Sequence, residues 1–404
     1  MLIAQSFSLG FRLFVAIIER AIGRDPFGNE GPASLLPLQC SIGSEASGSS
    51  GHSTQRVELM PPKLSHWISN SSFAPPTNAL HRLAAGGAIV AGALVVSALV
   101  NRFIAKRAER NHPPIGRFVD VGALRLHYIE QGDGEPLVLL HGNSGMIQDF
   151  TSSGLVERAA QRYRVIVFDR PGFGYSDRPR RTIWTPEAQA DVLHEALERI
   201  GISRATVLGH SWGASVAVAL ALKYPAFVRA LVLASGYFYP TFRSDVVFLS
   251  GPSIPGIGDI MSHTISPILG RIMRPLFMRK MFGPAPVPRK FDEFPKEMAL
   301  RPSQIRASAV ETALMIPDAF ALSKRYADLK MPVVIVAGQE DRLIDIDKQS
   351  ARLHADVTHS TLHRVPGAGH MVHQTATDAV MGAVDEAAGA RRENSRLSAK
   401  QRLA

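Results

Sequence analysis

The pentapeptide GHSWG at residues 209–213 places Ser211 between two glycines, after the apolar stretch ATVL and before the helical pattern ASVAVALAL. A strand that turns directly into a helix needs small residues beside the turn, because larger side chains would collide there. Such a turn lifts the serine hydroxyl above the sheet edge, and the positive end of the following helix stabilises negative charge beside it. We predict that Ser211 is a nucleophile and that His210 is a packing residue; the alternative is a purely structural turn.

A serine hydroxyl is a weak nucleophile near neutral pH, so Ser211 needs a general base, and that base needs a carboxylate to orient it. The strand pattern PVVIVAG ends shortly before Asp341, and the stretch LHRVPGAGH brings His370 after another expected strand. These positions predict a catalytic triad of Ser211, Asp341 and His370. The competing candidates are Glu340 and Asp345 for the acid, and His354, His359, His363 and His373 for the base.

The oxyanion that forms during acyl transfer needs N–H donors that are aimed in advance. The sequence HGNSG at residues 141–145 follows directly after the apolar run PLVLL, so its N–H groups can lie at the same sheet edge as Ser211. We expect the backbone N–H groups of Asn143 and Trp212 to form an oxyanion hole, with Ser144 as the alternative to Asn143. A glycine-rich turn without a catalytic role is the other interpretation.

Apolar runs predict the strands that position these residues. They lie at residues 117–121, 124–130, 136–140, 165–168, 206–208, 230–234 and 333–337. Helical patterns lie between several of them, one ending at Gly201 and another before Pro225. This alternation predicts an α/β fold, with a mostly parallel sheet that is covered by helices on both faces and begins with an antiparallel pair. The charged, glycine-containing segment 169–177 is expected to be a loop scaffold at the same edge, with a wall of the site as the alternative.

The motifs HGNSG, FDRPGFGYSDRP, GHSWG, GQEDRLI and GAGHMVH occur in this order, and with them residues 116–388 resemble the α/β-hydrolase fold superfamily. The resemblance implies a mostly parallel eight-stranded sheet, the Ser211–Asp341–His370 triad and a cap domain inserted after the sixth strand. Asn143 is similar to the asparagine that haloalkane dehalogenases place after His-Gly. Those enzymes and epoxide hydrolases use an aspartate nucleophile, however. Ser211 therefore favours the serine members, which include esterases, lipases, lactonases, carbon–carbon bond hydrolases and cofactor-free haloperoxidases.

The predicted hydrolase core comprises residues 116–237 and 331–388, and the segment 238–330 separates its two parts. A structureless loop of that length is unusual, so we expect a helical cap. The cap segment holds six of the 12 methionines and many phenylalanines, which predicts an apolar, adaptable pocket, with ordinary cap core as the alternative. Arg271, Arg274, Arg279 and Lys280 lie among its apolar residues, so the cap is also a candidate for contact with an anionic membrane.

The N-terminal part of the chain differs from the rest. Residues 1–80 contain a Ser/Gly-rich stretch that predicts disorder, and Met60 is a second possible start that would make this region mis-annotated. Residues 83–101 carry no charge and predict a transmembrane helix; a buried soluble helix and a cleaved signal peptide are the alternatives. The basic residues that follow predict a single-pass protein with its catalytic domain in the cytoplasm. Residues 389–404 are expected to be a solvated basic tail.

The chain has 404 residues, of which 46% are hydrophobic and 20% charged, and this composition excludes wholesale disorder, a collagen-like repeat and a pure coiled coil. The single cysteine, Cys40, excludes an intrachain disulfide framework and a multi-cysteine zinc site. The net charge of +10 is compatible with nucleic acid or an anionic membrane. Because the basic residues gather around the span, the cap and the tail without a nucleic-acid motif, we expect membrane lipid as a partner and no nucleic acid.

These observations predict a membrane-anchored serine hydrolase that cleaves a small, apolar carboxylic ester or related acyl substrate through an acyl-enzyme, without a metal or organic cofactor. A carbon–carbon bond hydrolase or a cofactor-free haloperoxidase or perhydrolase using the same triad is the alternative activity. A non-catalytic membrane scaffold with a hydrolase fold is the alternative from another class of protein.

Overall fold

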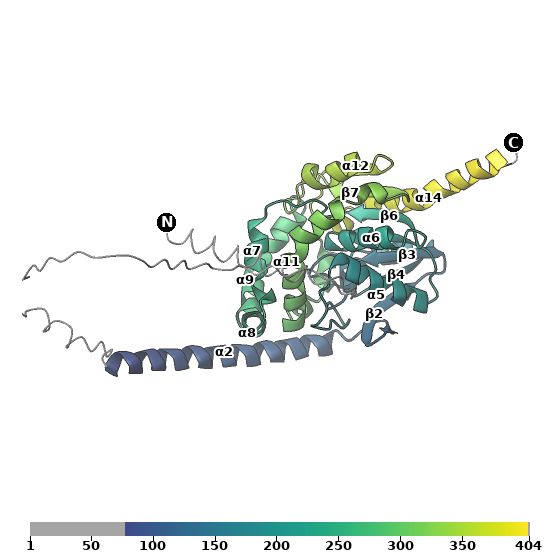
Figure 1. Cartoon of the computed structure of the whole chain (residues 1–404). Coiled ribbons are helices and arrows are strands. Elements are labelled where there is room, and N and C mark those ends of the chain that lie inside the picture. The colour runs from purple at the N-terminus through teal and green to yellow at the C-terminus, as the bar shows by residue number, and fades with distance from the viewer. Residues whose placement is uncertain (1–76, 403–404) are drawn as a thin grey trace, which may run out of the picture. The chain divides into compact units, whose positions relative to one another are not determined.

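The computed structural model describes residues 77–402, within a compact unit that comprises Ala74–Ala404. The predictions for the chain before residue 77, including disorder and the second start at Met60, lie outside the described residues. An eight-stranded sheet occupies the centre of the described part, with helices on both of its faces (Figure 1).

The sheet is mostly parallel, as predicted. Its strands are β1 (Arg117–Val121), β2 (Leu124–Gln131), β3 (Glu135–Leu140), β4 (Tyr163–Phe168), β5 (Ala205–His210), β6 (Val228–Ala234), β7 (Val333–Gly338) and β8 (Thr361–Val365). The strand order is β1-β2-β4-β3-β5-β6-β7-β8. Strand β2 runs antiparallel to β1 and to β4, and the other neighbouring strands are parallel. Every predicted apolar run lies within one of these strands, and β8 is the strand that was expected before His370.

Two apolar cores lie on opposite faces of the sheet. Successive side chains of a strand point to opposite faces, and in β3 Val138 and Leu140 belong to one core whereas Leu137 and Leu139 belong to the other. Covering helices on both faces explain why the central strands are continuous apolar runs. The sheet therefore holds the ends of β3, β5 and β7 at fixed positions along one edge.

Helices from several parts of the chain cover the sheet. Those outside the segment between β6 and β7 are α2 (Thr77–Asn111), α3 (Ile147–Thr151), α4 (Leu155–Ala159), α5 (Pro186–Arg199), α6 (Trp212–Lys223), α12 (Arg352–Asp356), α13 (Val372–Thr375) and α14 (Thr377–Arg402), with a π-helical turn η4 (Asp347–Ala351). Helix α5 begins where Thr185 accepts a hydrogen bond from the N–H of Ala188 at 3.2 Å. Helices α5 and α6 contribute to the core on one face, and α3, α4 and α14 contribute to the core on the other.

The segment between β6 and β7 is helical, in agreement with the predicted cap. It contains α7 (Ser244–Leu249), α8 (Ile257–His263), α9 (Ile265–Phe282), α10 (Lys296–Ala299) and α11 (Pro302–Ser323), with short 3-10 turns η1 (Gly251–Ser253), η2 (Arg289–Glu293) and η3 (Tyr326–Asp328). Phe282, Phe291 and Met298 pack with Met146 and Met371 from the core region. Part of the Met/Phe content of this segment therefore joins the cap to the sheet domain.

Helix α2 is longer at both ends than the span predicted at residues 83–101. Among the described residues it is the helix that is long and apolar enough to cross a membrane, by length and composition. Residues 84–93 are exposed, which is not the environment of a helix in a soluble core.

At the end of the chain, where a solvated basic tail was predicted at residues 389–404, the backbone is helical. The backbone of α14 continues through Arg402. The segment after Gly389 is rich in Ala, Arg, Glu, Lys and Leu, which are good helix formers, and it contains no proline to stop the helix.

Candidate active site

Ser211 occupies the turn between β5 and α6. Its backbone has φ 53° and ψ −120°, a conformation that non-glycine residues rarely adopt. A side chain at Gly213 would collide with the carbonyl oxygen of Leu140, and a side chain at Gly209 would collide with the carbonyl oxygen of Gly213. The two glycines therefore allow the tight strand-to-helix turn that was predicted from the pentapeptide.

The structure brings together the three residues of the predicted triad. The hydroxyl oxygen of Ser211 lies 3.0 Å from Nε2 of His370, and Nδ1 of His370 lies 2.8 Å from Oδ2 of Asp341. An ionised carboxylate only accepts hydrogen bonds, so Nδ1 carries the proton and Nε2 is the acceptor that faces Ser211. This arrangement can take the proton from Ser211 as its oxygen attacks a substrate.

The carboxylate of Asp341, just after β7, is held by hydrogen bonds from nearby backbone N–H groups. Its Oδ1 accepts hydrogen bonds from the N–H groups of Leu343 at 2.7 Å and Ile344 at 2.9 Å, which leaves Oδ2 for His370. The competing acids have other partners: Glu340 accepts from the N–H of Gly367 at 2.8 Å, and Asp345 pairs with Lys348.

The competing histidines also make separate contacts. Their partners are Ser360 for His354, the Met331 carbonyl for His359, Glu386 for His363 and Asp149 for His373. Among the candidate bases, His370 is therefore the one that the structure places beside Ser211.

A buried polar cluster of Asp149, His210 and His373 lies next to His370, and sequence reasoning missed it as a group. Nε2 of His210 lies 3.1 Å from the backbone oxygen of His370, and Nε2 of His373 lies 3.1 Å from Oδ1 of Asp149. Burial lowers the pKa of His210 well below its ordinary value. Burial alone would raise the pKa of Asp149, but the charge of His373 and its hydrogen bond outweigh burial and lower that pKa to about 2. The neutral imidazole of His210 thus supports the backbone of His370.

The same cluster contains the side chains that could hold a metal ion. Within residues 77–402, the ligand atoms of Asp149, His210 and His373 lie within 4.8 Å of one another. Nε2 of His373 already pairs with Oδ1 of Asp149, so a metal ion would have to replace that hydrogen bond. The spacing HxxH at residues 370–373 is the sequence signal that could have indicated a second buried histidine.

The two backbone donors of the predicted oxyanion hole lie in the loop after β3 and at the start of α6. In the described part of the chain, the N–H groups of Asn143 and Trp212 donate to no other residue. Trp212 is the first residue of α6, and the first N–H groups of a helix have no partner within it. Both groups are therefore available to a ligand, and the assignment of an oxyanion hole stays a prediction.

The side chain of Asn143 is tied to cap helix α11. Its amide nitrogen donates to the carbonyl oxygen of Ser308 at 3.1 Å and to Oγ1 of Thr312 at 3.0 Å. The hydroxyl oxygens of Ser144 and Ser308 lie 2.6 Å apart. The loop at residues 141–145 is thus fixed from the cap side, a contact that no local sequence pattern indicates.

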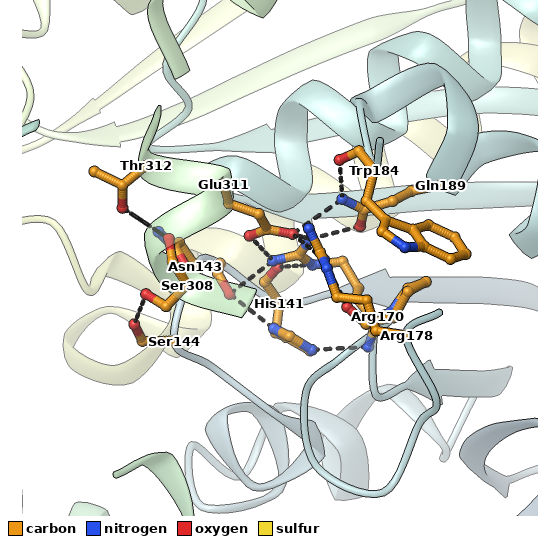
Figure 2. A network of polar contacts seen from close by, with 12 residues as sticks. His141, Asn143, Ser144, Arg170, Arg178, Trp184, Gln189, Ser308, Glu311 and Thr312 are labelled. Atoms are coloured by element: carbon orange, nitrogen blue, oxygen red, sulfur yellow. Dashed lines mark hydrogen bonds and ion pairs between the residues drawn. The ribbon is translucent and has the colours of Figure 1, made fainter. Parts of the chain in front are cut away.

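A buried ion pair holds the same loop, as Figure 2 shows. The guanidinium of Arg170 binds both carboxylate oxygens of Glu311 on α11, at 2.6 and 3.0 Å, and both side chains are 0% exposed. Arg170 also donates to the carbonyl oxygens of His141 at 2.7 Å and Gly142 at 3.1 Å. Burial and the charge of Arg170 lower the pKa of His141 to about 4, so this imidazole stays neutral. A glutamate within the apolar pattern of α11 is the signal that could have revealed this pair, because unpaired buried charges are rare.

The fold, the turn at Ser211 and the Ser211–His370–Asp341 contacts define a class of hydrolytic proteins. The family model described as "Alpha/beta hydrolase family" matches residues 137–383, and the chain belongs to this family.

Curated relatives of this chain have different activities. The 2-hydroxy-6-oxononadienedioate/2-hydroxy-6-oxononatrienedioate hydrolase 2 of Pseudomonas putida is 29% identical over 260 residues, which are 61% of this chain and 85% of the relative. Haloalkane dehalogenase 2 of Mycobacterium tuberculosis is 25% identical over 291 residues, which are 69% of this chain and 96% of the relative.

Solved structures share the fold. A membrane phospholipase A, described as a bacterial virulence factor, has a TM-score of 0.53 and 19% identity, and the match covers 77% of this chain and 98% of that one. A meta-cleavage product hydrolase has a TM-score of 0.57 and 21% identity, covering 69% of this chain and 99% of that one. At these identities the likeness concerns the fold and not the activity.

Proposed function

We propose that the chain is a membrane-tethered serine hydrolase that cleaves a carboxylic ester or related acyl compound of apolar character. The observation that carries this proposal is the contact of Ser211 with Nε2 of His370 at 3.0 Å, in an imidazole that Asp341 orients at 2.8 Å. Nucleophile, base and orienting acid are the three parts of a Ser-His-Asp triad that performs acyl transfer.

The reaction proceeds in two halves. The oxygen of Ser211 bonds to the carbonyl carbon while its proton passes to Nε2 of His370. The C–O bond of the ester breaks as that proton moves to the leaving alcohol, which gives an acyl-enzyme. Water then attacks the acyl carbon and gives a proton to His370, and the carboxylic acid leaves as Ser211 regains its proton. The N–H groups of Asn143 and Trp212 stabilise the oxyanion in both halves.

A second candidate is hydrolysis of a carbon–carbon bond, because curated relatives such as the Pseudomonas putida hydrolase are named for unsaturated 2-hydroxy-6-oxo acids, which contain no ester bond to hydrolyse. The substrates in those names are carboxylates, which require a cation in the site. Arg170 cannot supply one, since its five N–H donors are occupied by Glu311, Gln189 and the carbonyl oxygens of His141 and Gly142. Arg170 is therefore not available to bind a substrate carboxylate, and a direct comparison of an ester with a dienoate decides between the two candidates.

Dehalogenation has less support. The site residue that resembles those enzymes is Asn143, whose side-chain N–H groups both donate to α11. Ser211 also stands where those enzymes carry an aspartate. We therefore do not propose it.

The tether is α2, which is apolar, long and largely exposed. The basic residues after its apolar part support a cytoplasmic position for the catalytic domain; they are Arg102, Lys106, Arg107 and Arg110.

The full chain in detergent tests the proposed activity. A panel of p-nitrophenyl esters of increasing chain length is compared with 2-hydroxy-6-oxo-2,4-heptadienoate, the compound in the name of another curated relative. Ester turnover that is lost in Ser211→Ala supports the proposal. Faster turnover of the dienoate would favour the carbon–carbon hydrolase, and an inert wild type would favour the scaffold.

A further inference from the structure

Helix α2 packs against the cap along one face, at the end of its apolar segment. The partly or fully buried positions follow helical spacing; they are Leu94, Ser97, Ala98, Asn101, Ile104, Ala105 and Ala108. The other positions from residue 84 to Arg110 are exposed. The packed face therefore overlaps the part of α2 that is proposed to lie in the bilayer.

Hydrogen bonds fix the α8–α9 junction of the cap to this face. The hydroxyl of Ser97 donates to the carbonyl oxygen of Thr264 at 2.9 Å. The amide of Asn101 donates to the carbonyl oxygens of His263 at 3.0 Å and Thr264 at 2.9 Å, and its oxygen accepts from Arg271 at 2.9 Å. The depth of the α8–α9 junction in a bilayer is thus tied to the depth of Ser97 and Asn101.

That depth follows from helix geometry. A hydrocarbon core of about 30 Å needs about 20 helical residues, so a span that ends before Arg102 includes Ser97. At about 1.5 Å per residue, Ser97 lies roughly 7 Å closer to the bilayer centre than Arg102. The α8–α9 junction therefore lies near the boundary between acyl chains and headgroups.

The helices that meet at or near this junction expose several large apolar residues. On α9 the exposed apolar residues recur at helical spacing, which gives one continuous stripe: Ile265, Ile268, Leu269, Ile272 and Leu276. Ile272 is 67% exposed and Leu276 is 60% exposed. Neighbouring α7 and α8 add Val247, Phe248, Ile257 and Ile260. These nine residues are called the cap's apolar face, and Figure 1 shows α7, α8 and α9 together on the side of the molecule away from β3 and β4.

Cations accompany the apolar face. Arg274, Arg279 and Lys280 on α9 are exposed, and within residues 77–402 none of them forms an ion pair. Exposed Arg102, Lys106 and Arg107 follow the apolar part of α2. An apolar stripe flanked by cations has the composition of a helix that lies in the interface of an anionic membrane.

This inference rests on the proposed tether. We propose that the cap's apolar face inserts into the interfacial layer of an anionic phospholipid bilayer. The leaflet concerned is the one on the side of the catalytic domain, where α2 leaves the membrane. The cap is then a second membrane contact, continuous with the first. The hydrogen bonds at Ser97 and Asn101 hold the two contacts at one level.

The test uses the full chain in vesicles of phosphatidylcholine and phosphatidylglycerol, with Cys40→Ser to remove the native thiol. Single cysteines carry an environment-sensitive fluorophore at three sites: Ile272→Cys on the apolar face, Val90→Cys on α2, and Glu195→Cys on α5 as the matched control. Lipids with a nitroxide near the headgroup end of the acyl chain quench fluorophores at the interface, and lipids with a nitroxide near the methyl end quench fluorophores at the bilayer centre, where residue 90 is expected. We expect the label at residue 272 to lose emission by about twofold or more, whereas the label at 195 is unchanged.

The other outcomes separate the possible explanations. Quenching at residue 90 without quenching at 272 would overturn the cap contact and leave the tether intact. Quenching at neither site would overturn both, with no bearing on hydrolysis by Ser211. Disulfide cross-linking of Ile272→Cys between two chains, without lipid quenching, would show that a second copy covers the face and would also overturn the inference.

A paired substitution provides an independent readout. Ile268→Glu with Ile272→Glu places charges on the apolar face at exposed positions. With the label moved to Leu276→Cys, we expect nitroxide quenching to be lost. Ile183→Glu, at an exposed apolar residue on the sheet domain, should leave it unchanged. Equal quenching in all three proteins would contradict the inference.

Discussion

Arg170 and Glu311 form a fully buried, two-point ion pair that joins the loop after β4 to cap helix α11. Because Arg170 also donates to the carbonyl oxygens of His141 and Gly142, the pair links the cap to the loop that carries Asn143. The geometry of the proposed oxyanion hole thus depends on a contact between two parts of the chain that are distant in sequence.

Glu311→Gln should be strongly destabilising, because it leaves the charge of Arg170 buried without a counter-ion. We expect a loss of about 3 kcal/mol or more in the free energy of unfolding, measured by denaturant titration. The matched control is Glu195→Gln, which breaks the exposed pair with Arg199 and should cost less than about 1 kcal/mol. Equal stability of the two variants would show that the buried pair has no such role.

Asn143→Ala keeps the backbone N–H of the proposed oxyanion hole but removes the two side-chain hydrogen bonds to α11. If those two bonds hold the loop in place, kcat for a p-nitrophenyl ester should fall about 30-fold, from about 1 kcal/mol for each bond. Thr312→Val removes only one acceptor and should have a smaller effect. An unchanged kcat in Asn143→Ala would mean that the loop is positioned without the clamp.

Asp341→Asn should lower kcat by roughly 10³- to 10⁴-fold, because an amide does not hold the imidazole in the tautomer that leaves Nε2 as an acceptor. The N–H groups of Leu343 and Ile344 can still bind the remaining oxygen, so the fold should persist. Glu340→Gln and Asp345→Asn are matched controls with near wild-type rates. A large loss in either control, with activity retained in Asp341→Asn, would reassign the acid.

The folded chain should lose stability as the pH falls from about 6.5 to about 4. Burial and Arg170 lower the pKa of His141 from its ordinary 6.5 to about 4, so the unfolded chain binds more protons in this window. The contribution of His141 to the free energy of unfolding is complete above pH 6.5 and disappears toward pH 4. Its magnitude is on the order of 3 kcal/mol. The burial-lowered pKa of His210 acts in the same direction.

Denaturant titration across this pH range measures the slope of unfolding free energy against pH. The slope should be smaller in His141→Asn than in the wild type. If the slope in His141→Asn equals the slope in the wild type, His141 does not titrate in this way.

The strands and the triad could be predicted because their signals are local. Apolar runs of the right length mark β3, β5 and β7, and Ser211, Asp341 and His370 each follow a strand end that the parallel sheet brings to one edge. Two glycines around Ser211 are required by the backbone itself. These constraints are visible in short windows of sequence.

The contacts between cap and core were not predictable in this way. The Arg170–Glu311 pair, the clamp on Asn143 and the hydrogen bonds from Asn101 to the cap join residues more than a hundred positions apart, and no periodicity records which polar groups will meet. The Asp149–His210–His373 cluster was missed for the same reason. The tail was interpreted from its charge, although its composition also favours helix.

The most direct measurement of the central claim is covalent labelling of the full chain with a fluorophosphonate, followed by mass spectrometry of the modified peptide. The account predicts a single adduct on Ser211, absent in Ser211→Ala, together with loss of ester hydrolysis in that variant. An adduct on another residue, or undiminished hydrolysis by Ser211→Ala, would contradict it.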